Sequence, residues 1–231
     1  TCGAAAVSKI NLEDFFRYYA GTANQKKAVA ELEAAMPESL LRDLSPWVRT
    51  YRERPTLEAN NPLPVPYQSQ RDNASGTGYR ECFSSSCAMV AMFYGKIAND
   101  DAYNAIRAQF GDSTDAQAQV RALRSIGLQA DFCMDGNVER LEGLIAEGKP
   151  VPVGWLHKGA VPGTGGGHYA VICGFTDDHW IVNDPYGDCD LVNGGYPGST
   201  NGEMLRYSRK NWTPRWECDG PGTGWYVHIW E

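Results

Sequence analysis

Apolar side chains recur at helical spacing over the first part of the chain. This pattern predicts three short helices between residues 11 and 54, followed by a proline-rich stretch at 60–66 that no regular helix can span. We therefore predict a small N-terminal helical segment at 1–60 and a larger domain at 61–231. Aromatic side chains at helical spacing are usually core residues, so we expect those of the segment to pack, with glycan binding as the alternative.

Beyond residue 61 the period of the apolar positions changes twice. Helical spacing returns at 84–94, 115–126 and 137–147, and each run is followed by a glycine that suits a helix end. From Pro150 onward, short apolar runs predict strands at 151–155, 168–174, 179–182 and 225–230. Helices first and strands second is the order of an α+β domain.

Composition excludes several classes of protein. The 231 residues carry a formal net charge of −7, which argues against sequence-independent binding of nucleic acid. The longest apolar runs are too short to cross a bilayer, and residues 1–10 lack the pattern of a secretory signal. We therefore expect neither a nucleic-acid partner nor a membrane partner.

The cysteine count leaves the redox state open. Seven cysteines cannot all pair within one chain, so one free thiol with up to three disulfides and a fully reduced protein both fit. No C-x-x-C pair is present, which argues against a zinc site. The aspartates of the later loops lack the spacing of a calcium-binding loop, namely Asp177, Asp178, Asp188 and Asp190. The sequence therefore implies no cofactor.

Cys82 lies just before the predicted helix at 84–94. A helix N-terminus offers free N–H groups and partial positive charge, which stabilise a thiolate and can bind an oxyanion. Cys87 lies inside the same helix, where neither benefit is available. Burial or disulfide formation is the commoner fate of a cysteine, so position alone does not make Cys82 catalytic.

A histidine and an aspartate strengthen that interpretation. His168 follows three glycines and begins a strand, which places its imidazole at a sheet edge with room for a substrate. Asp184 ends the next strand, and a hairpin between the two strands brings both residues to the same end. A carboxylate there accepts the second imidazole N–H and completes a Cys-His-acid triad. The other histidines are expected at the surface or within a strand, namely His157, His179 and His228.

Three ordered motifs resemble the peptidase C39-like branch of papain-like proteins. In that family the cysteine stands in a C-G-P-T-S-x-A-M-like segment, the histidine in G-H-x-x-V and the aspartate in D-P. The matching segments here are 82–89, 167–171 and 183–187, preceded by Val65-Pro66-Tyr67-Gln68-Ser69-Gln70. Such domains occur in tailed phages and cyanobacteria, and some are thought to be cell-wall lysins. The resemblance implies a papain-like α+β fold, in which the helix that bears the nucleophile packs on an antiparallel sheet.

The sequence departs from this family at two points. Phe83-Ser84-Ser85 stands where the family has Gly-Pro-Thr, so the start of the helix is built differently. Papain-like enzymes also place an oxyanion-hole glutamine a few residues before the cysteine. The candidate here is Gln70, twelve positions upstream of Cys82, with Gln68 as the alternate.

The leading hypothesis is a cysteine hydrolase that cleaves a peptide or amide bond, in bacterial peptidoglycan above all, as an endolysin-like endopeptidase or amidase. Cys82, His168 and Asp184 would be catalytic, and Gln70 would help to hold the oxyanion. One alternative is a cysteine protease or acyl transferase that acts on a protein, such as a leader or a virion protein. Another is an inactive wall-binding or virion module. Glycine-rich stretches at 158–167 and 193–202 would form mobile walls of the cleft.

Overall fold

A computed structural model describes Lys27, Glu31, Ala34 and residues 61–231. The N-terminal segment predicted at 1–60 therefore lies almost wholly outside the described residues, and its packing and its boundary stay predictions. The three described positions within it are helical.

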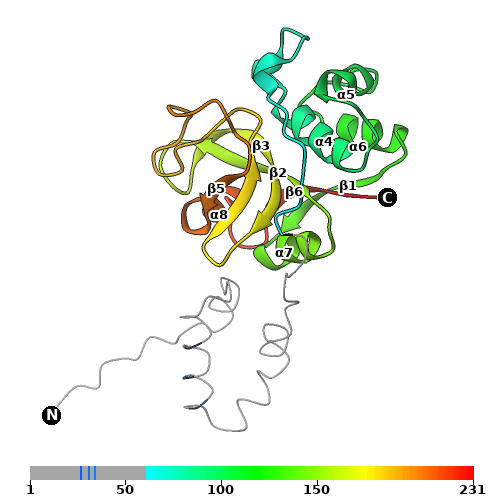
Figure 1. The fold of residues 1–231 in the computed structure, drawn as a ribbon. Coiled ribbons are helices and arrows are strands. Elements are labelled where there is room, and N and C mark those ends of the chain that lie inside the picture. The colour runs from blue at the N-terminus through cyan, green and yellow to red at the C-terminus, as the bar shows by residue number, and fades with distance from the viewer. Residues whose placement is uncertain (1–26, 28–30, 32–33, 35–60) are drawn as a thin grey trace, which may run out of the picture. The chain divides into compact units, whose positions relative to one another are not determined.

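A six-stranded antiparallel sheet forms the centre of the described domain (Figure 1). Its order is β1-β6-β2-β3-β4-β5, and β3, which carries His168, lies between β2 and β4. The strands are β1 (Gln129–Gly136), β2 (Val151–Lys158), β3 (Thr164–Phe175), β4 (His179–Asn183), β5 (Leu205–Ser208) and β6 (Gly224–Trp230). The residues at the start of β3 are therefore held by a neighbouring strand rather than by a loop.

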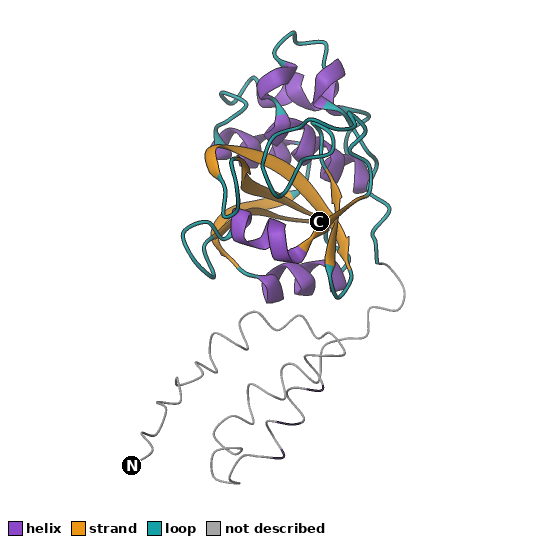
Figure 2. Ribbon diagram, turned by 90° about the vertical axis from the view of Figure 1, so that its left-hand side faces the viewer, coloured by secondary structure: helices purple, strands orange, loops and turns teal. Residues whose placement is uncertain are grey.

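Helices cover both faces of this sheet (Figure 2). On one face, α4 packs against β3, where the rings of Phe83 and Tyr169 stack with centroids 3.6 Å apart. On the other face, Trp212 of α8 packs against Trp155, which opposes His168 in the β2–β3 register and so points away from Tyr169. The described helices are α4 (Cys82–Phe93), α5 (Asp100–Arg107), α6 (Ala116–Ser125), α7 (Val138–Ala146) and α8 (Arg209–Trp216).

The predicted fold class is confirmed: the domain is α+β, and the helix that begins with Cys82 packs on an antiparallel sheet. The helices predicted at 84–94, 115–126 and 137–147 are α4, α6 and α7, and the four predicted strands are present. The pattern did not predict α5, β1, β5 or α8. A proline inside α8 and the largely exposed side chains of β1 explain why two of these gave no apolar periodicity.

Arg215 of α8 joins two chain segments at the end of the sheet that carries His168. Its side chain is fully buried and donates to the carbonyl oxygens of Leu156, Gly159 and Leu191 at 3.0, 2.6 and 2.9 Å. A Cβ atom at Gly194 would lie 2.4 Å from the backbone nitrogen of Gly159, so the two backbones are in direct contact. The stretches predicted to be mobile walls are thus tied together, and Thr164 to Gly167 form part of β3.

Candidate active site

Cys82 is the first residue of α4 and is partly exposed. Glu81, the residue before it, makes no side-chain capping bond, so no side chain of this residue blocks the first N–H groups of the helix. Cys87 is fully buried within the same helix, and burial raises the pKa of its thiol. Of the two cysteines, Cys82 therefore has the position that nucleophilic chemistry needs.

The hairpin of β3 and β4 brings His168 and Asp184 together. The strands pair with Val171 opposite Asn183, and the imidazole Nε2 of His168 lies 2.7 Å from Oδ1 of Asp184. Cys82 is the second neighbour that acts electrostatically on this imidazole. Since Nε2 is engaged by the carboxylate, Nδ1 is the nitrogen left for another partner. The imidazole is thus coupled both to the carboxylate and to the thiol.

The charge state of His168 follows from these two neighbours. Burial alone lowers the pKa of this imidazole, but the charges of Asp184 and Cys82 and hydrogen bonds to both raise it to about 10. The residue is 4% exposed, so little water screens these charges. At neutral pH the ring is therefore an imidazolium.

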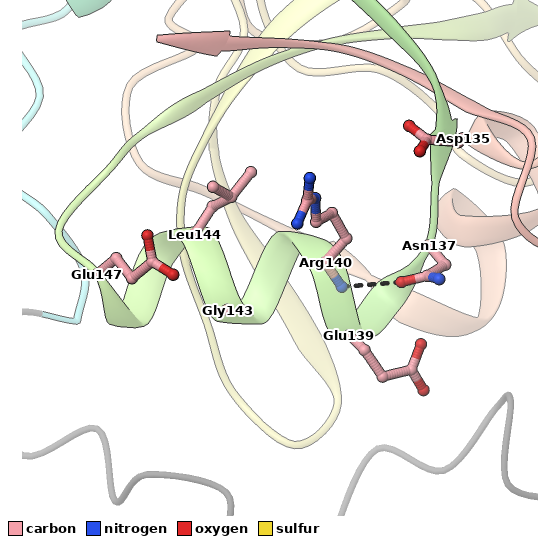
Figure 3. A pocket seen from close by; sticks show the side chains of 7 residues that line it. All are labelled: Asp135, Asn137, Glu139, Arg140, Gly143, Leu144 and Glu147. Carbon is pink, nitrogen blue, oxygen red and sulfur yellow. Dashed lines mark hydrogen bonds between the residues drawn. The ribbon is translucent and has the colours of Figure 1, made fainter. Parts of the chain in front are cut away.

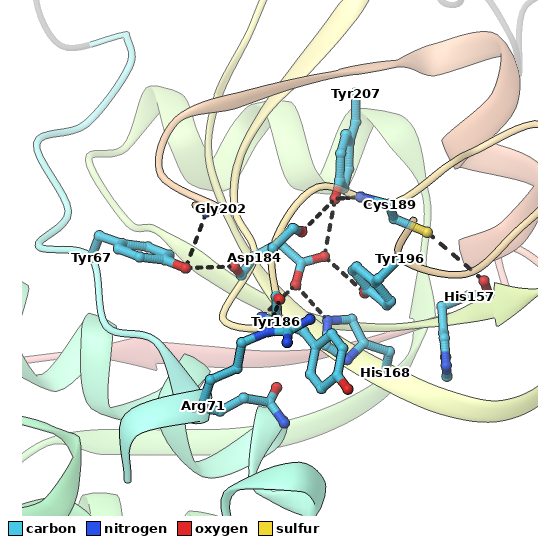
Figure 4. A network of polar contacts seen from close by, with 12 residues as sticks. Tyr67, Arg71, His157, His168, Asp184, Tyr186, Cys189, Tyr196, Gly202 and Tyr207 are labelled. Atoms are coloured by element: carbon cyan, nitrogen blue, oxygen red, sulfur yellow. Dashed lines mark hydrogen bonds and ion pairs between the residues drawn. The ribbon is translucent and has the colours of Figure 1, made fainter. Parts of the chain in front are cut away.

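Asp184 is held by four hydrogen-bond donors (Figure 4). Its Oδ1 accepts from His168 and from the backbone N–H of Tyr186 at 2.9 Å, and its Oδ2 accepts from the hydroxyls of Tyr196 and Tyr207 at 3.0 and 3.1 Å. Burial and the charge of Asp184 raise the pKa of both tyrosines, so their hydroxyls stay protonated and donate. A carboxylate has about four acceptor positions, and here all are used, which fixes its orientation toward His168.

The backbone of Asp184 is packed just as closely. The hydroxyl of Tyr67 donates to the Asp184 carbonyl at 3.2 Å and accepts the N–H of Gly202 at 3.1 Å. A Cβ atom at Gly202 would lie 1.8 Å from that same carbonyl oxygen, so only glycine allows this approach. The segment before α4 and the segment before β5 therefore meet at Asp184.

Gln70 lies in a short 3₁₀ turn, η1 (Gln70–Asp72), and its side chain is buried. Its backbone N–H donates to Pro185, next to Asp184, and its Nε2 donates to the carbonyl of Gly78 at 2.7 Å, in the second turn η2 (Gly78–Arg80). A Cβ atom at Gly78 would lie 2.1 Å from the Gln70 carbonyl oxygen. One amide hydrogen of Gln70 is thus used to orient the group, and its Oε1 is buried without a hydrogen-bond partner among the described residues.

Gln68, the alternate candidate, is placed differently. Its Nε2 donates to the Tyr67 carbonyl at 2.8 Å, and its Oε1 accepts from the backbone N–H of Asp100 at 3.4 Å. Both ends of this amide therefore bind the protein scaffold. The prediction that Gln70 is the oxyanion donor is the one that this geometry favours.

The residues that replace Gly-Pro-Thr after the cysteine have structural partners. Phe83 stacks on Tyr169, as described above. The Ser84 hydroxyl accepts from Arg107 of α5 at 3.2 Å and from Gln119 of α6 at 2.9 Å, and the Ser85 hydroxyl donates to Asp100 at 2.7 Å. The departure from the family motif therefore reflects a buried polar contact between α4 and its two neighbouring helices.

Glu81 is a buried carboxylate beside Cys82 that the sequence did not single out. It accepts hydrogen bonds from Asn73, Ser75 and Thr77 at 2.7, 2.8 and 2.7 Å, which closes the polar loop before α4. Burial raises the pKa of Glu81, but these hydrogen bonds outweigh it and lower the pKa overall. In the sequence, this role of Glu81 is indicated by the Asn, Ser and Thr residues that closely precede it.

The sequence predicts His157 at the surface, but this residue is half-buried beside the site. Its ring centroid lies 5.5 Å from that of His168 and 5.7 Å from that of Tyr196. Burial and the neighbouring His168 lower the pKa of His157 to about 4, so it stays neutral. Side chains alternate between the two faces of β2, so His157 lies on the same face as Trp155, which pairs with His168 across the β2–β3 register. This alternation could have indicated the position of His157.

No group of three or more His, Cys, Asp or Glu among residues that the structure describes could hold a metal ion. The described cysteines all carry free thiols, namely Cys82, Cys87, Cys133, Cys173, Cys189 and Cys218. Within the same described part, no helix is long and apolar enough to span a bilayer.

A groove of about 480 Å³ lies along α7 (Figure 3). Its lining residues belong to α7 and to the chain just before and after that helix, and none of them belongs to the site above: Asp135, Asn137, Glu139, Arg140, Gly143, Leu144 and Glu147. Arg140 donates to the hydroxyl of Tyr226 at 3.1 Å and so is engaged within the fold. The groove is thus lined by none of the candidate active-site residues.

One family model and one solved structure that resemble this chain are both described as C39-like peptidases. The model of a family described as "Peptidase_C39 like family" matches residues 62–209. Among solved structures, a protein from Bacillus anthracis described as a C39-like peptidase is 14% identical, with 71% of this chain and 94% of that chain covered and a TM-score of 0.50. No curated protein matches the chain.

Two further solved structures are similar. One is a double glycine motif protease from an AMS/PCAT transporter, in complex with its leader peptide, which is 22% identical, with 74% of this chain and 95% of that chain covered and a TM-score of 0.46. The other is the peptidase domain of Streptococcus ComA, an ABC transporter, which is 18% identical, with 66% and 92% covered and a TM-score of 0.43.

The opposite pKa shifts of the two neighbouring histidines can be measured by NMR titration of the imidazole carbons. We expect His168 to titrate near pH 10 and His157 near pH 4, whereas an unperturbed histidine titrates at about 6.5. In Asp184→Asn the carboxylate charge is lost, burial dominates, and the pKa of His168 falls. Two histidines that both titrate at the ordinary value would contradict the ion pair.

The same shift predicts how stability depends on pH. The folded-state pKa of His168 lies above its unfolded value, so the stability that the ion pair contributes is fully present below about pH 6.5. This contribution is lost as the pH rises through about 10, where His168 gives up its proton. Urea unfolding of wild type and Asp184→Asn across this range checks the direction, since only the wild type should show this loss.

Proposed function

The chain belongs to the peptidase C39-like family and is a cysteine peptidase, and on this basis we propose that it cleaves its substrate with a Cys82–His168–Asp184 triad. The observation that carries the proposal is the buried 2.7 Å contact between the His168 imidazole and the Asp184 carboxylate, in a histidine whose pKa the neighbouring Cys82 also raises. A module that had lost its activity would have no need to keep a buried ion pair of this kind, which costs desolvation energy.

Each step of the reaction has a group to perform it. The sulfur of Cys82, having given its proton to Nδ1 of His168, attacks the carbonyl carbon of the substrate. The oxyanion that forms accepts the backbone N–H of Cys82 and the free amide hydrogen of Gln70. His168 then gives its proton to the leaving nitrogen, so that the carbon–nitrogen bond breaks and a thioester with Cys82 remains.

The second half of the reaction reverses these roles. His168, now neutral, takes a proton from a water molecule, which attacks the thioester carbonyl. The carbon–sulfur bond breaks, the carboxylic acid product leaves, and Cys82 and His168 return to their starting state. Throughout, Asp184 accepts the N–H of Nε2 and so keeps Nδ1 directed at the sulfur and the substrate.

For the substrate we propose a peptide, with the peptide cross-links of the bacterial wall as the specific case and a polypeptide as the second. The triad forms the same acyl-enzyme with either, so its chemistry does not separate them. Tyr79, three residues before Cys82, is 75% exposed and offers an aromatic surface beside the nucleophile. Such a surface can pack on an extended peptide of either kind.

The substrate class and the nucleophile can be tested together. Purified peptidoglycan and an unfolded protein mixture are each incubated with wild type, Cys82→Ala and Cys87→Ala, and new amine ends are read by mass spectrometry. We expect wild type and Cys87→Ala to cleave and Cys82→Ala to lose activity by at least about a thousandfold. Cleavage that survives in Cys82→Ala would refute the nucleophile, and activity on protein alone would refute the wall substrate.

The two glutamines provide a test of the oxyanion hole. We expect Gln70→Ala to lower kcat by about 100-fold with little change in KM, because the lost hydrogen bond stabilises the transition state. Gln68→Ala is the matched control, since its amide binds only the scaffold, and it should retain its rate. An equal loss in both variants would show that Gln70 acts only through the packing of its segment.

A further inference from the structure

Arg71 carries a guanidinium beside the catalytic imidazole that no acidic side chain of the described residues pairs with. It lies in η1, directly after Gln70, and its side chain is exposed. Figure 4 shows the side chain extending toward Tyr186 and His168. In a protein with a net charge of −7, an exposed and unpaired cation at this place needs an explanation.

Two contacts fix the orientation of this guanidinium. Its Nε donates to the carbonyl oxygen of Tyr186 at 2.7 Å, and its central carbon lies 3.9 Å from the centroid of the Tyr186 ring. The stacked face and Nε are therefore occupied, whereas the two terminal nitrogens remain available. A planar fork of N–H donors held in this way matches the two oxygens of a carboxylate.

The nearby carboxylates do not neutralise Arg71. Both oxygens of Asp184 are used by His168, Tyr186, Tyr196 and Tyr207. Asp72 follows Arg71 in the chain, but it forms no ion pair with it within the described structure. By contrast, Arg80, which lies on the other turn before Cys82, is paired with Asp112 at 2.8 Å.

The location indicates which part of a substrate Arg71 would meet. One aromatic ring separates it from the imidazole, since the Tyr186 and His168 centroids are 6.4 Å apart. His168 protonates the leaving nitrogen in the proposed reaction, so the part of the substrate that follows the scissile bond lies beside this imidazole. Tyr186 and Arg71 flank that part.

We propose that Arg71 binds a carboxylate of the substrate on the leaving-group side of the scissile bond. The inference rests on the proposed function and adds a substrate class to it: peptides that carry an acidic group after the cleaved bond. The carboxylate can belong to an acidic side chain or to the C-terminus of a short leaving peptide. Both sources share the chemistry that an oriented guanidinium recognises.

A purely structural role for Arg71 makes a different prediction. Arg71 binds the carbonyl of Tyr186, whose N–H in turn holds Asp184. If Arg71 only supported this turn, its loss would slow the cleavage of every peptide by the same factor. A carboxylate subsite would instead slow acidic peptides alone.

The experiment uses the full chain and synthetic peptides. A mixed peptide library first identifies a cleaved sequence that has an acidic residue in its leaving part. This peptide is then made in three forms, which are the original, one with Glu→Gln or Asp→Asn, and one with an amidated C-terminus. We measure kcat/KM of each form with wild type, Arg71→Gln, Arg71→Lys and the control Arg80→Gln.

We expect wild type and Arg80→Gln to prefer the acidic form by about tenfold or more, because a charge-assisted pair is lost in the neutral form. Arg71→Gln should cleave all forms at the rate that wild type shows on the neutral one, and Arg71→Lys should keep part of the preference. If wild type cleaves the side-chain amide form more slowly than the original, the carboxylate belongs to the acidic side chain. If it cleaves the C-terminal amide form more slowly, the carboxylate is the C-terminus.

Three results would overturn the proposal. Wild type that cleaves peptides without any preference for the acidic form would refute the subsite and leave the proposed function intact. A uniform loss across all forms in Arg71→Gln would show a structural role. Wild type that cleaves no peptide at all would refute the proposed function, and the subsite with it.

Discussion

The site depends on one buried carboxylate. Asp184 is fully buried and accepts hydrogen bonds from an imidazole, a backbone N–H and two tyrosine hydroxyls. A buried anion without such donors would cost several kcal/mol, so the surrounding chain has to supply them. Tyr186 from the turn, Tyr196 from the glycine-rich stretch and Tyr207 from β5 meet this need. The orientation of His168 then follows from the position of Asp184.

The architecture shows how distant parts of the chain are brought to this carboxylate. The β3–β4 hairpin supplies the imidazole, the segment before α4 supplies Tyr67 and Gln70, and Arg215 fixes the loops on the far side. Most of these contacts end on backbone carbonyl groups, and glycines at 78, 194 and 202 allow the chain segments to approach one another closely. Cys82, the proposed nucleophile, lies in a different layer, at the start of α4. The proposed reaction therefore joins the helical layer to the sheet.

Much of this could be predicted from the sequence because the signals are local. The helix periodicity after Cys82 is enough to place this residue at a helix start. The strand after Gly167 and the short link between the two strands are enough to place His168 and Asp184 at one end of a hairpin. Tyr196 and Tyr207 could not be identified, because their role depends on where a long irregular stretch folds back. His157 was assigned to the surface, since the polar residues around it concealed that β2 pairs with the strand that carries His168. Arg71 was overlooked because nothing in its sequence context shows that it stacks on Tyr186.

We propose that His168 and Asp184 activate Cys82 and no other thiol. The most direct test is covalent trapping by a peptide with an electrophilic vinyl sulfone, followed by intact mass and peptide mapping, in wild type, His168→Ala and Asp184→Asn. We expect one adduct per chain at Cys82 in wild type, which forms more slowly in Asp184→Asn and is absent in His168→Ala. Adducts at Cys133 or Cys218, or trapping at Cys82 that proceeds at the same rate without His168, would contradict it.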